Sequence, residues 1–208
     1  MARTFDLSDD GVVVVIGSGA GGGTVANELA QAGVDVVCLE AGGRLSFADI
    51  ENDPGAMDAK MGWPHRRDGP YTWLCKTVGG TTMRWSGVSL RLQEHEFRAR
   101  STYGAIDGAN IIDWPLTLSD LAPYYARAEA KMGVSGTSGL PPSAEINNFQ
   151  VLRAGAEKLG YSRIDSTRMA INPIAYDGRP GCIQLGFCHS GCAIGAKWST
   201  LYTEISKA

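Results

Sequence analysis

The sequence predicts an α/β fold that begins with a strand, a helix and a second, parallel strand. The first observation is the unbroken β-branched run Val12–Ile16, which is typical of a strand buried on both faces of a parallel sheet. The glycine-rich segment 17–22 follows it directly, and a second apolar run at 34–39 ends on Glu40. Together these observations predict one β-α-β unit over residues 11–40.

The glycine-rich segment has the spacing of a dinucleotide-binding turn. Gly17 permits the tight turn out of the strand, Gly19 lets backbone amides approach a pyrophosphate, and Gly22 lets the helix pack close to the sheet. A helix N-terminus favours the anion, and Glu40 can accept hydrogen bonds from an adenosine ribose. The residues Ser18, Ala20 and Gly21 complete the candidate turn. The motif predicts a dinucleotide and leaves NAD and FAD both open.

The helix after this turn is predicted from Val25, Leu29 and Ala32, with Gly33 as its C-cap. Beyond Glu40 the sequence loses periodicity until about residue 74. We expect an irregular stretch of this length to be functional or lid-like.

A second glycine-containing segment is a candidate ligand loop. Gly79 and Gly80 are followed by two hydroxyl residues, Thr81 and Thr82. Paired glycines can bring main-chain amides against a planar or anionic ligand, and Trp85 can pack against a ring system. An ordinary turn is the alternative interpretation of the same residues.

Two amphipathic helices are predicted in the second half of the chain. Ser119 is the expected N-cap of the first, which Gly133 ends, and the second carries its apolar residues between 149 and 159. We expect both helices to be packing elements. The Gly-, Ser- and Pro-rich segment 133–143 between them is the expected subdomain crossing.

Composition and charge exclude several classes of protein. The formal net charge is -3 and basic residues are scattered, so neither a nucleic acid nor an anionic membrane surface is expected as a partner. No apolar run approaches the length of a membrane span, and the first residues lack the apolar core of a secretory signal. We expect a cytoplasmic protein, with periplasmic location through an exported partner subunit as the alternative.

Five motifs in order resemble the glucose-methanol-choline (GMC) oxidoreductases, a family of FAD-dependent enzymes. They are the glycine turn 17–22, Glu40-Ala41-Gly42, Val78-Gly79-Gly80 with Trp85, Asp113-Trp114-Pro115-Leu116 and Leu121-Ala122-Pro123-Tyr124-Tyr125. The similarity is greatest to bacterial members acting on sugars and sugar acids, such as gluconate 2-dehydrogenase flavoprotein subunits and pyranose oxidase-like proteins.

The resemblance implies a Rossmann-like FAD-binding domain in a two-domain flavoprotein of the GMC/p-cresol type. It implies oxidation of a CH-OH group of a sugar, sugar acid or other alcohol, with hydride transfer to flavin N5. The pyrophosphate would bind at 17–22, the adenosine ribose at Glu40 and Ala41, and the flavin end at 78–82. Oxygen, a quinone-like dye or a cytochrome remain open as electron acceptors.

The resemblance also implies a division of the chain. Residues 1–140 are expected to form the N-terminal part of the FAD-binding domain. Residues 141–208 would begin the substrate domain and return, through a cysteine-rich segment, toward the FAD-binding domain. The C-terminal half of the family pattern is absent, so we expect the catalytic base beyond Ala208 and an isolated chain without activity.

Arg84 departs from the pattern of some family members. Pyranose oxidase-like members can carry at the corresponding position, just before the matching tryptophan, a histidine that bonds covalently to the flavin. Because arginine cannot make that bond, we expect FAD to be held non-covalently.

Three cysteines near the end of the chain are a candidate metal site. Cys182, Cys188 and Cys192 are interleaved with glycines, which let several sulfurs converge as an iron-sulfur cluster requires. Some related glucose dehydrogenases carry such a cluster and pass electrons to a cytochrome partner, although those proteins have two adjacent cysteines where Ile183 follows Cys182 here. Buried or paired thiols are the alternative, as is zinc bound with His189.

Two other classes of function remain open from the residues. A nicotinamide-dependent dehydrogenase would share the glycine turn without requiring Glu40-Ala41-Gly42 or the Gly79-Gly80 segment. A non-catalytic FAD-binding or assembly module is the second alternative. Under the main hypothesis the partners are a small alcohol or sugar substrate and an electron-transfer cytochrome or small subunit.

Overall fold

The computed structural model describes residues 4–6, 8–62 and 74–208, which form two compact units. The first unit consists of Met1–Gly87 and Cys182–Ala208, and the second of Val88–Gly181. The expected boundary at residues 140 and 141 lies inside the second unit. The assignment of residues 1–140 to an FAD-binding domain stays a prediction.

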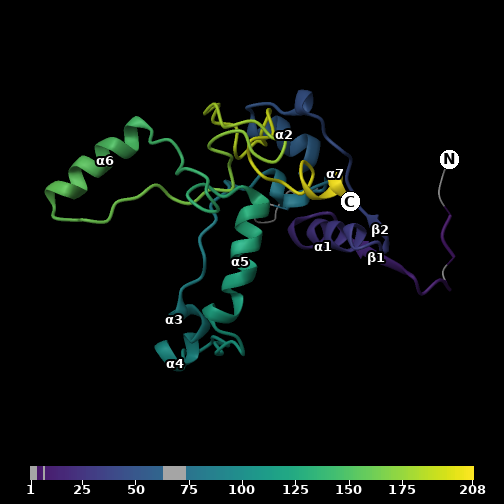
Figure 1. The fold of residues 1–208 in the computed structure, drawn as a ribbon, viewed down its shortest axis with the longest axis horizontal. Helices are drawn as coiled ribbons and strands as arrows, with labels where there is room; N and C mark the ends of the chain where they lie inside the picture. The colour runs from purple at the N-terminus through teal and green to yellow at the C-terminus, as the bar shows by residue number, and fades with distance from the viewer. Residues whose placement is uncertain (1–3, 7, 63–73) are drawn as a thin grey trace. The chain divides into compact units, whose positions relative to one another are not determined.

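The first unit contains the predicted β-α-β unit. Strands β1 (Val12–Ile16) and β2 (Asp35–Leu39) pair in parallel, with Val12 opposite Asp35, and helix α1 (Ala20–Gln31) connects them. Figure 1 shows α1 beside the two strands. The α/β prediction is therefore confirmed, and α1 begins at Ala20, inside the glycine-rich segment.

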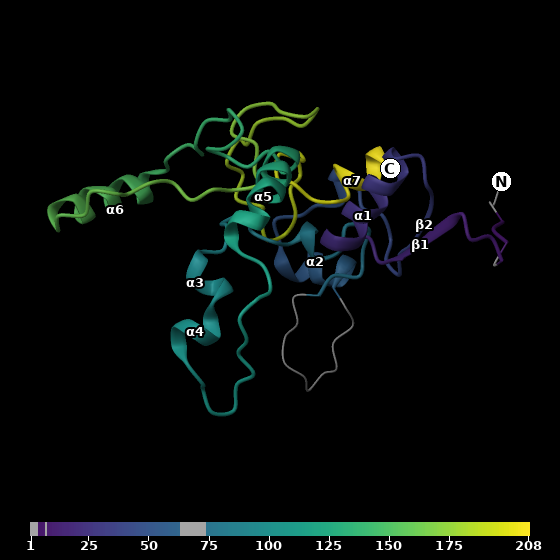
Figure 2. The ribbon, with the colours of Figure 1, turned by 60° about the horizontal axis from the view of Figure 1, so that its bottom comes forward.

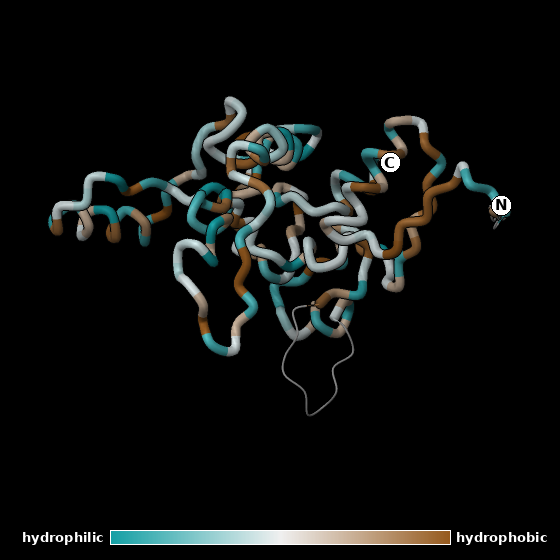
Figure 3. The backbone as a smooth tube through the Cα atoms, turned by 90° about the horizontal axis from the view of Figure 1, so that it is seen from below, coloured by the Kyte–Doolittle hydropathy of each residue, from teal (hydrophilic) through white to brown (hydrophobic). Residues whose placement is uncertain are grey.

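The burial expected for β1 is wrong. Val15 is its one buried residue, whereas Val14 is 56% and Ile16 86% exposed. Figure 3 shows both strands as hydrophobic segments of the tube. In the described parts of the chain the sheet has two strands, so few neighbouring elements are available to cover its apolar side chains.

The stretch after β2 is more regular than its sequence indicates. It contains a short 3-10 helix, η1 (Phe47–Asp49), and an α-helix, α2 (Pro54–Met61). The Asp53 carboxylate caps α2 by accepting hydrogen bonds from the backbone N–H groups of Gly55 and Ala56 at 2.8 and 3.0 Å. The rest of the predicted lid-like stretch, residues 63–73, lies outside the described residues.

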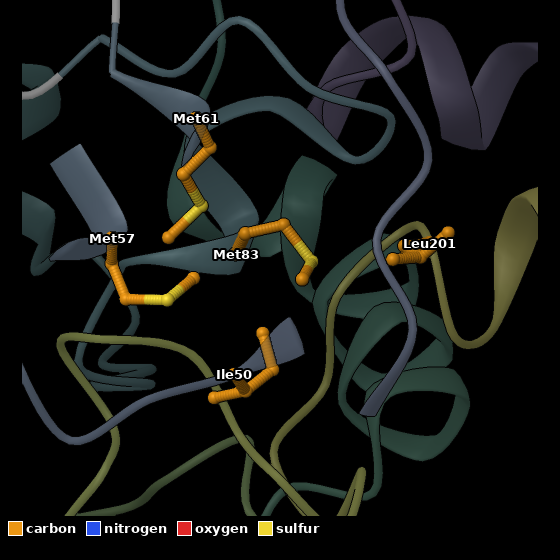
Figure 4. Close-up of a cluster of buried hydrophobic side chains, with 5 residues drawn as sticks. All are labelled: Ile50, Met57, Met61, Met83 and Leu201. Carbon is orange, nitrogen blue, oxygen red and sulfur yellow. The ribbon is translucent and has the colours of Figure 1, made fainter. Parts of the chain in front are cut away.

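A methionine-rich core joins distant parts of the first unit. The side chains of Met57 and Met61 from α2 meet Met83, Ile50 and Leu201 (Figure 4). Met83 ends the 3-10 helix η2 (Gly80–Met83), which directly follows the Gly79 turn. Burying five apolar side chains together fixes η2 against α2 and against the C-terminal segment.

The C-terminal helix α7 (Glu204–Lys207) packs on α1. Both ribbon views place it next to α1 (Figures 1 and 2). The Asn27 amide of α1 donates to the Glu204 carboxylate at 2.5 Å, and both residues are buried. Residues near the end of the chain thus support the helix that follows the glycine turn.

The second unit is helical. It contains α3 (Glu94–Phe97), α4 (Ala99–Tyr103), α5 (Leu118–Met132) and α6 (Asn147–Lys158). Gly133 ends α5 in the left-handed conformation, as predicted. The expected N-cap, however, is wrong: Thr117, not Ser119, exchanges hydrogen bonds with Asp120 in a capping box.

Helix α6 does not pack as expected. None of its residues is buried, and Val151 and Leu152 are 74% and 64% exposed. The chain after α6 runs back alongside the helix (Figures 1 and 2), and Arg153 donates to the Ile164 carbonyl at 3.2 Å. Within the described residues, the apolar side of α6 is therefore largely uncovered.

The buried residue of α5 is a carboxylate. Glu129 accepts two hydrogen bonds from the Arg91 guanidinium, each at 2.7 Å. This bidentate pair connects α5 to the segment before α3. No helix in the described segments is both long and apolar enough to cross a membrane.

Candidate dinucleotide site

The glycine turn joins β1 to α1 by close backbone packing. Gly17 has a φ of 86° and donates its N–H to the Leu39 carbonyl of β2 at 2.7 Å. A Cβ atom on Gly22 would lie 2.0 Å from the Gly17 carbonyl oxygen. Only glycine fits position 22, because the first turn of α1 lies directly against the loop.

The other side of the turn is open. A Cβ atom on Gly19 or Gly21 would meet no atom within 4 Å. The hydrogen bonds of α1 begin at Gly23, whose N–H donates to the Gly19 carbonyl at 2.8 Å. Among the described residues, the amides of positions 19–22 have no acceptor. The helix dipole and these amides together form a cradle that suits an anion such as a pyrophosphate.

Glu40 is bound to the glycine turn. Its Oε2 accepts from the Ser18 hydroxyl at 2.6 Å and the Ser18 N–H at 3.0 Å, and its Oε1 accepts from the Gly42 N–H at 2.9 Å. Burial raises the pKa of Glu40, but the hydrogen bonds from Ser18 and Gly42 outweigh it, so the pKa lies below its ordinary value. These bonds hold an ionised carboxylate, which is an acceptor suited to a ribose hydroxyl, beside the glycine turn.

The Gly79-Gly80 segment lies against the same turn. The Gly79 N–H donates to the Ser18 hydroxyl oxygen at 2.9 Å. A Cβ atom on Gly80 would be 3.0 Å from the Gly19 Cα. The structure thus connects three segments predicted separately from the sequence, through a chain of hydrogen bonds from Gly79 to Ser18 to Glu40.

The other predicted cofactor-binding residues differ in how far they are buried. Val78 is half-buried against the methionine-rich core, and Thr82 is buried with its hydroxyl donating to the Gly79 carbonyl at 2.5 Å. The residues Ala20, Ala41 and Thr81 are exposed.

Trp85 uses its indole within the protein. Its Nε1–H donates to the Trp198 carbonyl at 2.9 Å, and the two rings form an edge contact with centroids 5.7 Å apart. The ring partner found for Trp85 is therefore another tryptophan.

The Arg84 side chain is buried and paired inside the protein. Its guanidinium forms an ion pair with Asp58 of α2 and donates to the His189 carbonyl at 3.2 Å. With 2% of the residue exposed, Arg84 holds the end of η2 against α2.

Lys197 is a central residue that the sequence does not reveal. Its ammonium donates to the carbonyl oxygens of Met83, Trp85 and Cys188 at 3.0, 2.6 and 2.5 Å. Burial lowers the pKa of Lys197 to about 8, although nearby thiols oppose the shift. Lysine is rarely buried unless paired, so the residue type gives no indication of this interior position.

The cysteines do not form the expected ligand set. All five are thiols outside any disulfide, and in the described segments no group of three or more His, Cys, Asp or Glu side chains is placed to hold a metal ion. Burial raises the pKa of Cys188, and also that of Cys75, which favours the neutral thiol. The arrangement gives the predicted iron-sulfur cluster at Cys182, Cys188 and Cys192 no support.

The glycine turn, the acid after β2 and the facing glycine pair are the features typical of the dinucleotide-binding class of α/β proteins. Comparison with known proteins identifies the family to which the chain belongs. The GMC oxidoreductase family model matches residues 34–208, and the chain belongs to this family. Because that match begins after α1, the glycine turn is a separate observation in favour of the same conclusion.

Three relatives illustrate the similarity. Paromamine 6'-oxidase of Streptomyces fradiae is 35% identical over 93% of this chain and 38% of its own length. Fructose dehydrogenase large subunit of Gluconobacter japonicus is 30% identical, over 93% of the chain and 42% of the relative. Gluconate 2-dehydrogenase flavoprotein of Pantoea cypripedii is 30% identical over 60% of this chain and 25% of its own length. The chain therefore spans less than half the length of these relatives.

Proposed function

We propose that the chain provides the FAD-binding part of an oxidoreductase that acts on the CH-OH group of a sugar or other alcohol. The observation that carries this proposal is the hydrogen-bond chain from Gly79 through Ser18 to Glu40. It brings the turn suited to a pyrophosphate, the acid suited to a ribose and a second glycine loop into one site. A nicotinamide-binding unit would require only the first two of these.

The residues present fit the parts of FAD. The unpaired amides at 19–22 would bind the pyrophosphate, and Glu40 the adenosine ribose. The backbone around Gly79 and Gly80 would approach the flavin side, since Gly80 lies directly against Gly19 of the glycine turn. When bound, FAD would supply the acceptor for a hydride from the carbinol carbon.

The mode of attachment is proposed to be non-covalent. Arg84 occupies the position where some family members carry a flavin-bonding histidine, and its guanidinium is held by Asp58. The base that accepts the hydroxyl proton is proposed to lie outside residues 1–208.

Substrate and partners are proposed from the relatives. Two of the three relatives are named for carbohydrate substrates, fructose and gluconate, which supports a sugar, a sugar acid or a related alcohol. One relative is named as a large subunit, which supports a second, electron-accepting subunit or cytochrome.

An iron-sulfur cluster remains a secondary hypothesis that rests on cysteine spacing alone. Iron and acid-labile sulfide analysis of purified protein tests it, and a metal-free preparation with full flavin content would count against it.

The nature of the dinucleotide can be tested directly. FAD and NAD⁺ are each titrated into the apo chain while intrinsic tryptophan fluorescence and, for FAD, the flavin absorbance bands are recorded. The proposal predicts saturable binding of FAD and a much weaker response to NAD⁺. Preferential binding of NAD⁺ would instead favour the nicotinamide-dependent class.

A further inference from the structure

Thr200 lies between the two halves of the candidate site. It is fully buried, and its hydroxyl donates to the Ser18 carbonyl at 2.6 Å, a contact between residues 182 positions apart. Its backbone N–H donates to the Thr82 hydroxyl oxygen at 3.2 Å. Thr82 in turn donates to the Gly79 carbonyl at 2.5 Å.

The available protons fix the direction of this network. A threonine hydroxyl has one proton, and the shortest contact of each hydroxyl identifies its acceptor. Thr200 therefore donates to Ser18, and Thr82 donates to Gly79. The longer approaches of the Thr200 hydroxyl, 3.3 Å to Thr82 Oγ1 and 3.3 Å to the Gly79 carbonyl, are secondary.

The bond to Ser18 orients an amide of the cradle. A trans peptide unit is planar, so its carbonyl and the following N–H point in opposite directions. Because Thr200 holds the Ser18 carbonyl toward the interior, the Gly19 N–H is directed away from it. Gly19 borders the open side of the turn, where a Cβ atom would meet nothing within 4 Å.

Thr200 has little room to move. A Cβ atom on Gly23 would lie 2.8 Å from the Thr200 Cβ, so the threonine side chain rests directly on the backbone of α1. The next residue, Leu201, is part of the methionine-rich core. This packing fixes the Thr200 hydroxyl relative to both the glycine turn and η2.

We propose that Thr200 is a positioning residue of the FAD site, which sets the separation between the glycine turn and the Gly79 loop. The proposal rests on the proposed FAD function and assigns Thr200 no contact with FAD itself. Its hydroxyl, through Ser18, orients the amides that face the pyrophosphate and steadies the bond from Gly79 to Ser18. Its backbone N–H, through Thr82, also holds the loop on the flavin side. A threonine that served only as packing would have an effect on stability alone.

Two variants and a matched control separate positioning from packing. Thr200→Val keeps the shape and removes the hydroxyl, whereas Thr200→Ser keeps the hydroxyl and removes a methyl group. Thr203→Val is the control, because Thr203 is an equally buried threonine of the same segment whose hydroxyl donates locally, to the Ser199 carbonyl at 2.8 Å. FAD affinity is measured by fluorescence titration of folded protein. Amide hydrogen exchange of Gly79 is measured by NMR without FAD.

The expected results differ among the variants. Thr200→Val should bind FAD roughly ten- to a hundredfold more weakly, since a buried carbonyl loses its donor. Its Gly79 amide donates to the Ser18 hydroxyl, and Ser18 loses the bond from Thr200, so this amide should exchange about tenfold faster than in the unsubstituted chain after correction for global stability. Thr200→Ser should restore both values to within about threefold, and Thr203→Val should change neither.

The two proposals fail in different ways. Failure of the unsubstituted chain to bind FAD would overturn the proposed function. In that case the Gly79 exchange rate still decides whether Thr200 fixes the loop. Unchanged FAD affinity or unchanged Gly79 exchange in folded Thr200→Val, or equal effects in Thr203→Val, would overturn the role of Thr200.

Discussion

The Ser18 hydroxyl donates to Glu40 Oε2 at 2.6 Å and connects the turn after β1 to the end of β2. The same hydroxyl accepts the Gly79 N–H, so one small side chain links three segments of the candidate FAD site. A hydroxyl can donate once and accept twice, which makes serine suited to this central position. The negative charge of Glu40 strengthens the bond from Ser18, since hydrogen bonds to ionised acceptors are stronger than neutral ones.

The Glu40 interaction predicts a pH dependence of stability. Because the pKa of Glu40 is lowered in the folded protein, its contribution is present above the ordinary glutamate pKa of 4.5 and is lost as the pH falls through the lowered value. Glu40→Gln should lower the free energy of unfolding near neutral pH by about 1 kcal/mol and remove this part of the acid dependence. Urea unfolding across an acidic pH series measures both. Identical pH profiles for the two proteins would contradict the prediction.

Two of the three glycines in the first turn of α1, Gly21 and Gly22, should tolerate alanine very differently. Gly22→Ala places a Cβ atom 2.0 Å from a backbone oxygen, so we expect a loss of about 3 kcal/mol or more, or failure to fold. Gly21→Ala meets no neighbour and should raise stability by about 0.5–1 kcal/mol through helix propensity. Thermal unfolding compares the variants, and similar melting temperatures for both would be inconsistent with the close helix packing.

Removing the buried ammonium should destabilise the first unit. Lys197→Met leaves three carbonyls without their donor, each costing about 1–3 kcal/mol, while relief of the buried charge offsets part of the loss. A net decrease of about 2–4 kcal/mol in the free energy of unfolding is expected. The exposed Lys207 provides a control, since Lys207→Met should change stability by less than about 0.5 kcal/mol. Equal effects at the two positions would rule out a structural role for the Lys197 ammonium.

The methionine-rich core should respond to truncation. Met57 is fully buried, so Met57→Ala should cost about 2–5 kcal/mol through lost burial and the cavity left behind. Val25→Ala on the half-exposed side of α1 should cost less than about 1 kcal/mol. Chemical denaturation measures both values. A neutral Met57→Ala would show that α2 and η2 are not held together by this cluster.

Local signals in the sequence predicted the elements that depend on local chemistry. The β-branched run predicted the strand, and helical spacing predicted α1. Glycines, which readily adopt positive φ, predicted the turn after β1 and the end of α5. The burial of β1 did not follow, because an apolar run indicates what a strand can bury and not which neighbours are present. For α6 the same reasoning failed, since its apolar side has little to pack against among the described residues.

The residues that assemble the site across long separations were not predictable in the same way. Thr200 and Lys197 act through contacts with segments more than one hundred positions away, and their own neighbours in sequence give no periodic signal. Asp53 was a recognisable N-cap before Pro54, so α2 could have been found from a cap followed by proline. The cysteine spacing indicated a metal site, and the described residues contain no group of side chains placed to hold a metal ion.

Calorimetric titration of FAD into the chain and into Gly19→Ala measures whether the glycine turn binds the cofactor. Position 19 has open space for a methyl group, so the variant should fold with stability within about 1 kcal/mol of the original. The added Cβ would nevertheless lie where the pyrophosphate approaches the turn, and the account predicts FAD binding at least about tenfold weaker than in the unsubstituted chain. Equal FAD affinity in the two folded proteins, or no binding by either, would contradict the assignment of this turn to the cofactor.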